Sequence, residues 1–240
     1  MSGTNAARRQ DEGGWRYIHS MDYLYMLNHK LDFIGFFYRT AVQPFQSAMD
    51  AIQDGTAPYG EGPSETDGAP PFTTEWIEFN DGRLTLGNLT LSVIAVVLQE
   101  FLAASVQNMG LGTPPKVAKK SWLDRYGALI RATLGIDIRS LAKEPSLIEE
   151  IILARNLTQH PGDIGTNWVY QDPEYAKRYP KGEFVSGFYA SVLQDAQEDP
   201  DPVSSPLEVS QEKVDIAIRA VRDFCSAMGA AFQRYPQYWN

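Results

Sequence analysis

The chain has 240 residues, 43% of them hydrophobic, and its 21 basic and 30 acidic side chains give a formal net charge of −9. This length and apolar content suffice for one large core or two small ones, and the single cysteine, Cys225, excludes a disulfide framework or a cysteine-rich metal site. The acid excess disfavours a protein that coats nucleic acid by bulk charge, but it leaves room for a small basic site.

The N-terminal segment 1–15 is polar and has no apolar run, so it is expected to be disordered and not to be a signal peptide. We therefore expect a cytoplasmic protein. From Leu24 to Ile52 apolar side chains recur three and four positions apart, which predicts one helix of roughly thirty residues. Pro44 lies inside this stripe and is expected to kink or split the helix, and Gly55 marks its end.

Residues 55–74 are rich in proline and glycine and are expected to form a loop. A short β-hairpin is expected to follow, with strands at Trp76–Phe79 and Leu84–Leu86 and a turn at Asp81–Gly82. Such a ribbon would be marginally stable alone, so it is predicted only as an addition to a helical core.

A second helix is predicted from about Thr90 to Asn108, and its apolar residues on nearly every face predict a central position. Its most apolar stretch, Leu89–Leu98, is broken by Gln99 and Glu100 before it could span a bilayer, so no membrane is expected as a partner. The glycines and prolines of 110–115 predict a helix end. They do not suit a phosphate loop, because prolines stand where backbone donors are needed.

Two shorter helices are predicted next. One begins after Ser121, an N-cap with Asp124 three positions on, and ends near Gly135. The other opens around Pro145 and buries a stripe at 147, 148, 151 and 152 before Pro161 stops it.

Residues 161–206 are predicted to be irregular, apart from a short element near 184–193. The last helix begins near Val209 and buries Cys225 on its apolar stripe. The prediction is therefore a single all-α domain over 1–240, a bundle of four to five helices with long irregular insertions.

One group of residues has coherent chemistry: Arg155, Asn156 and His160, at the end of the fourth helix. Arginine offers a planar fork to phosphate oxygens, and histidine can transfer a proton near neutral pH. Asn156 and His160 share a helix face, whereas Arg155 converges with His160 only if the helix ends there, which Pro161 favours. An Arg-Asn pair followed by histidine at this spacing is expected by composition roughly 0.005 times.

A purely structural interpretation of the same residues stays open. Arg155 would then pair with an acid such as Glu149 or Asp163, and His160 would cap the helix and interact with its dipole. The adjacent Glu149 and Glu150 do not suggest a paired-carboxylate site, because they point to different helix faces.

The segment Ile151–Gly162, IILARNLTQHPG, resembles the signature of the HEPN superfamily (higher eukaryotes and prokaryotes nucleotide-binding domains). That signature is an arginine, a polar residue that is often asparagine, and then a histidine, on a helix of an all-α bundle. The long last helix after a variable loop is also similar to the family. The long 161–206 connection and the hairpin depart from it.

The resemblance implies a metal-independent endoribonuclease without a cofactor, in which a ribose 2′-hydroxyl attacks the adjacent phosphate. On that basis His160 moves protons, Arg155 stabilises charge and Asn156 orients one of them. The family implies a homodimer with RNA as substrate, and a role as a toxin or antiviral defence factor with an antitoxin or other partner subunit. Some members are instead non-catalytic nucleotide-binding or interaction subunits. Gly162 replaces the tyrosine that is adenylylated in some relatives, so that switch is not expected.

Overall fold

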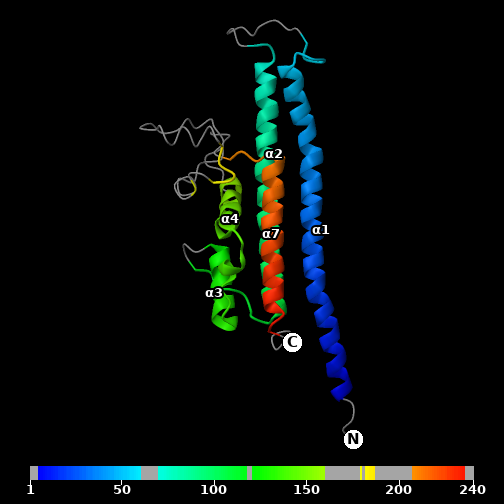
Figure 1. Cartoon of the computed structure of the whole chain (residues 1–240), viewed down its shortest axis with the longest axis vertical. Coiled ribbons are helices and arrows are strands. Elements are labelled where there is room, and N and C mark those ends of the chain that lie inside the picture. Colours follow the sequence, from blue (N-terminus) through cyan, green and yellow to red (C-terminus); the bar gives the residue numbers. More distant parts are fainter. Residues whose placement is uncertain are drawn as a thin grey trace, which may run out of the picture. The chain divides into compact units, whose positions relative to one another are not determined.

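The computed structural model describes the backbone of residues 5–60, 70–117, 121–159, 179, 182–186 and 207–235, and the side chains of the same ranges except 5–22 and 156–159. This part of the chain is all-α, as predicted (Figure 1). Its helices are α1 (Asn5–Gln53), α2 (Thr73–Asn108), α3 (Trp122–Leu134), the 3-10 helix η1 (Ile138–Leu141), α4 (Pro145–Gln159) and α7 (Gln211–Phe232).

The chain divides into two compact units. The first contains residues 1–33, 94–149 and 216–240, and the second contains 34–93 and 150–215. Helices α1, α2, α4 and α7 each contribute residues to both. The single-domain organisation over 1–240 stays a prediction.

Helix α1 is longer than expected. It begins at Asn5 and has 49 residues, so the prediction of disorder is wrong for residues 5–15. A polar segment can extend a helix that is already nucleated, because nucleation is the unfavourable step, and alanine, arginine and glutamate are good helix formers. The helix also continues through Pro44 without splitting, and buried Tyr38 and Met49 hold it on either side.

The predicted hairpin is wrong, because its residues form the first half of α2. Gly82 does not make a turn. A Cβ at this position would overlap the ring of Phe45. Gly87 likewise lets Val209 approach, since a Cβ there would lie 2.7 Å from the Cβ of Val209. The glycine that looks like a turn signal in the sequence is needed for close packing, and local sequence cannot distinguish these two uses.

The C-terminal ends of α1 and α2 confirm the predicted glycine caps. Gly55 and Gly110 have positive φ values of 59° and 64°. At each end two backbone bonds close a Schellman motif: Thr56 donates to Ala51 and Gly55 to Ile52, while Leu111 donates to Val106 and Gly110 to Gln107. The glycines of 110–112 therefore end a helix and do not form a phosphate loop.

The core is built from stripes that the sequence predicted. On α7 the side chains of Val214, Ile218, Val221, Cys225, Met228 and Phe232 are all buried. Burial raises the pKa of the Cys225 thiol well above its ordinary value, so it packs as a small apolar residue. His29, which lies off the stripe of α1, is exposed, as expected.

Helix α2 is the one described helix that is long and apolar enough to cross a membrane, by length and composition alone. Within the structure, 61% of its most apolar 18-residue window is buried. These apolar side chains are therefore covered largely by protein.

The first unit is held by ion pairs as well as by its core. Lys30 of α1 pairs with Glu100 of α2 at 2.6 Å, and Arg222 of α7 pairs with Asp32 of α1 at 2.5 Å. Arg139 of η1 bonds Asp124 of α3 at 2.6 Å and also pairs with Glu149 of α4. It thereby links three consecutive elements.

Helix α3 begins with the predicted cap, which is a complete capping box between Ser121 and Asp124. Burial alone would raise the pKa of the Asp124 carboxyl. The hydrogen bonds from Ser121 and Arg139 and the charge of Arg139 outweigh this and lower the pKa overall. The carboxylate therefore stabilises the fold above the ordinary aspartate pKa of 3.8, and this contribution is lost as pH falls through the lowered folded value.

We expect Ser121→Ala to lower the free energy of unfolding by about 1 kcal/mol at neutral pH, because the N–H of Asp124 loses its cap. Urea denaturation measures this. Ser226→Ala, at an exposed position on α7, is the matched control and should change it by less than about 0.5 kcal/mol. Equal stability of the two variants would contradict the role of the cap.

Candidate functional site

The candidate site lies toward the C-terminal end of α4, in the second unit. The predicted buried stripe of α4 is confirmed, since Ile151 and Ile152 are 0% and 2% exposed. Arg155 follows these residues by four and three positions, so it occupies the next position of the same stripe. Its side chain is accordingly half-buried.

The guanidinium of Arg155 is incompletely satisfied. Its Nε atom is buried and has no hydrogen-bond partner within the part of the chain that is described. Glu149, one acid considered as its partner, pairs with Arg139, and Asp163 lies outside the described residues. A buried polar group without a partner costs about 1–3 kcal/mol, and the Nε atoms of Arg83 and Arg125 are also buried without one.

The other two predicted site residues are described less completely. The backbone of Asn156 is helical, but its side chain is not among those described. Helix α4 is described as far as Gln159, and His160 lies outside the described residues. The convergence of Arg155 with His160 stays a prediction.

Glu150 is a neighbour on α4 for which sequence reasoning found no role. It is 4% exposed, and one of its carboxylate oxygens accepts the backbone N–H of Phe184 at 2.9 Å. A Cβ at Gly182 would overlap this carboxylate, so the glycine makes the contact possible. The two adjacent acids serve different faces, as predicted: Glu149 binds Arg139, and Glu150 anchors the 182–186 segment. The position of Glu150 between the buried residues Ile148 and Ile151 was the sequence signal that could have predicted its burial.

The anchored segment joins a second one. Val185 and Leu207 form an antiparallel β-bridge, and Glu208 donates its N–H to the carbonyl of Phe184 at 2.9 Å. Phe184 is fully buried. A single buried carboxylate thus ties both segments to α4.

A buried tyrosine fixes the second segment to α1. Tyr38 is 1% exposed, and its hydroxyl donates to the carbonyl of Val209 at 2.7 Å. Burial raises the pKa of this phenol above its ordinary value of 10.0, and the positive charge of Arg83 lowers it in part. Arg83 in turn lies 3.7 Å from Glu208 and donates to Asn80 at 2.9 Å.

The described part of α4 and its neighbours offers one cation on an apolar stripe and a buried carboxylate that is already engaged. A half-buried arginine with an unsatisfied donor suits an anion such as phosphate. No three histidine, cysteine, aspartate or glutamate side chains among the described residues converge so that they could hold a metal.

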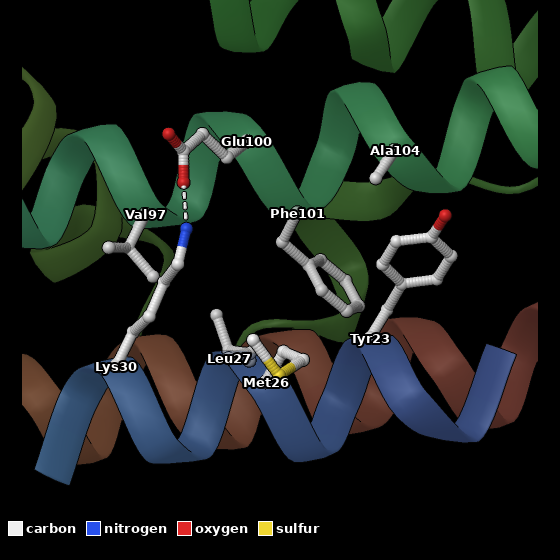
Figure 2. A pocket seen from close by; sticks show the side chains of 8 residues that line it. All are labelled: Tyr23, Met26, Leu27, Lys30, Val97, Glu100, Phe101 and Ala104. Carbon is white, nitrogen blue, oxygen red and sulfur yellow. Dashed lines mark hydrogen bonds and ion pairs between the residues drawn. The ribbon is translucent and has the colours of Figure 1, made fainter. Parts of the chain in front are cut away.

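A hollow lies in the first unit, between α1 and α2 (Figure 2). It has a volume of about 250 Å³ and is lined mainly by apolar side chains, including Met26, Val97 and Phe101. Its charged groups, Lys30 and Glu100, neutralise each other across the groove and are about half exposed. Such a pair contributes little energy and leaves no free charge for chemistry.

No protein-family model, curated protein or solved structure matched the chain in comparisons with each. The likeness to the HEPN signature therefore rests on the residues of α4 and those that follow it.

We expect Glu150→Ala to lower the free energy of unfolding by about 1–3 kcal/mol, because the buried N–H of Phe184 loses its acceptor. Amide hydrogen exchange should speed up at Phe184. The matched variant Glu150→Gln keeps an acceptor oxygen and should be affected less. Unchanged protection of Phe184 in the alanine variant would show that the segment is held by other contacts.

For Tyr38 we expect a loss of stability above about pH 10, where the unfolded chain's tyrosine ionises but the buried phenol resists until its raised folded pKa. Chemical denaturation between pH 8 and 11 measures this loss. In Tyr38→Phe the decline should be shallower than in wild type, although the variant is less stable at pH 8 by about 1 kcal/mol. Tyr25→Phe, at a 68% exposed position, should run parallel to wild type. Parallel curves for Tyr38→Phe would refute this.

Proposed function

We propose that the protein is a HEPN-like endoribonuclease that cleaves RNA without a metal ion, with Arg155, Asn156 and His160 as its site. The observation that carries the proposal is Arg155. It stands where the stripe of α4 would otherwise continue with an apolar side chain, and its Nε lacks a partner among the described residues. A phosphate would supply the missing acceptors. The all-α fold agrees with this assignment.

The chemistry follows from the residue types. His160 takes the proton of the ribose 2′-hydroxyl, whose oxygen attacks the adjacent phosphorus. The bond from phosphorus to the 5′ oxygen breaks, and that oxygen receives a proton, which leaves a 2′,3′-cyclic phosphate and a 5′-hydroxyl. Arg155 stabilises the additional negative charge on the phosphoryl oxygens, and Asn156 orients the side chain of either Arg155 or His160.

A homodimer would resolve the conflict with the net charge of −9. Two copies of Arg155 in one groove concentrate positive charge locally, and two histidines provide both a base and an acid. Such a cytoplasmic enzyme would act as a toxin or an antiviral defence factor, controlled by an antitoxin or another partner subunit.

A second candidate is a non-catalytic HEPN-like nucleotide-binding or interaction subunit. The observation that favours it is the set of exposed aromatic side chains on α1, where Tyr25, Phe33 and Phe36 are 68%, 58% and 59% exposed. Large exposed apolar side chains on one element are typical of protein interaction surfaces. The acid excess of the chain also fits an interaction role better than RNA binding.

Incubation of the pure protein with RNA in excess EDTA tests the enzyme. We expect cleavage to persist in EDTA and to fall at least about 100-fold in Arg155→Ala and in His160→Ala, because each removes a group that acts in the transition state. Arg155→Lys keeps the charge but not the fork and should retain part of the activity.

Arg131→Ala is the matched control, since this arginine is 72% exposed on α3 and lies 3.9 Å from Asp137. It should cleave like wild type. Equal residual cleavage by wild type and the Arg155 and His160 variants would refute the enzyme and leave the interaction subunit.

A further inference from the structure

A cavity of about 880 Å³ lies in the second unit, where α1 ends and α2 begins. This size is within the range of small-molecule binding sites. The lining residues used below are Asp54, Tyr59, Phe72, Thr73 and Trp76. The cavity is separate from α4, so an inference from it does not depend on the proposed ribonuclease.

Aromatic rings form adjoining walls of the cavity. The ring centroids of Tyr59 and Phe72 are 5.4 Å apart, and the ring planes meet at 73°. Phe79, which is not among the lining residues, packs edge-on against Tyr59 at 6.2 Å and helps to fix its orientation. Trp76 adds a third ring one turn into α2. The edge-to-face contact fixes the two rings relative to each other.

The backbone is strained to hold one of these rings. Phe72 has a φ of 63°, the left-handed region that a bulky residue rarely adopts, at a cost of about 1–2 kcal/mol. Its carbonyl accepts the N–H of Trp76 at 3.0 Å, so it sits where α2 starts. The hydroxyl of Thr73 donates to the carbonyl of Pro70 at 2.7 Å, which holds the same turn. Strain of this kind recurs at ligand sites.

The described lining of the cavity carries charge of one sign. Asp54 is its charged side chain at neutral pH, and no lysine, arginine or histidine is found among the lining residues that are described. The C-terminal end of α1 and the N-terminal end of α2 both border the cavity, and their opposite dipoles partly cancel. The carboxylate therefore decides the sign, and a cation is favoured.

We propose that this cavity binds an organic ammonium ion, with the ammonium group against the rings of Tyr59, Phe72 and Trp76 and near the carboxylate of Asp54. Aromatic faces attract cations through their negative quadrupole, and tryptophan does so best. An alkylated ammonium is weakly hydrated, so it can leave water for these rings. A small metal ion would need more oxygen ligands than one carboxylate provides.

Choline and its neutral isostere 3,3-dimethyl-1-butanol test the proposal by isothermal titration calorimetry on the full chain. Choline should bind saturably, and the isostere should bind at least about tenfold more weakly, because it has the same shape without the charge. Equal binding of the two, or no saturable binding of choline, would overturn the proposal.

Variants locate the binding. Trp76→Ala and Asp54→Asn should each weaken choline binding by about threefold to tenfold, and Trp76→Phe should weaken it less. Phe37→Ala removes a half-exposed aromatic side chain outside the cavity and should bind like wild type. Because Asp54 is exposed, Asp54→Asn should fold normally, which circular dichroism checks. Unchanged affinity in both Trp76→Ala and Asp54→Asn would place choline elsewhere and refute the assignment.

Discussion

Burial of the apolar surface of α2 is the constraint on which the rest of the fold depends. Leu91, Ile94, Leu98 and Leu102 are completely buried, and apolar residues occupy other faces of the same helix. Such a helix is stable in water only if neighbours cover it nearly all round. In the first unit α1 and α7 are joined by the pair Arg222–Asp32. In the second unit Gly82 and Gly87 admit Phe45 and Val209 to close contact with α2.

The same preference for burial makes Arg155 informative. A stripe that continues from Ile151 and Ile152 would be more stable with an apolar residue at the next position. An arginine there gives up stability, because its Nε is buried without a partner among the described residues. Glu150, on the same helix, shows the contrasting case: it is more deeply buried, but it has a backbone donor and anchors a segment.

Arg155 differs from several other basic residues in its ion pairing. Lys30, Lys143, Arg139 and Arg222 each lie against an acid, so the described surface that carries them presents neutralised pairs. An acidic chain would bind RNA weakly through a surface on which these cations are paired. Any RNA chemistry therefore depends on a local concentration of positive charge, which is the reason that we propose a dimer.

Local patterns were sufficient to predict the all-α class, the stripe of α7, the capping box at Ser121 and the glycine caps at Gly55 and Gly110, because each depends on residues within a few positions of one another. They also singled out Arg155. The hairpin prediction was wrong because Gly82 and Gly87 are needed for packing against residues that are distant in the sequence. The predicted start of α1 was too late because a nucleated helix extends into polar sequence. The roles of Glu150 and the cavity beside Asp54 arise from segments that only the folded chain brings together.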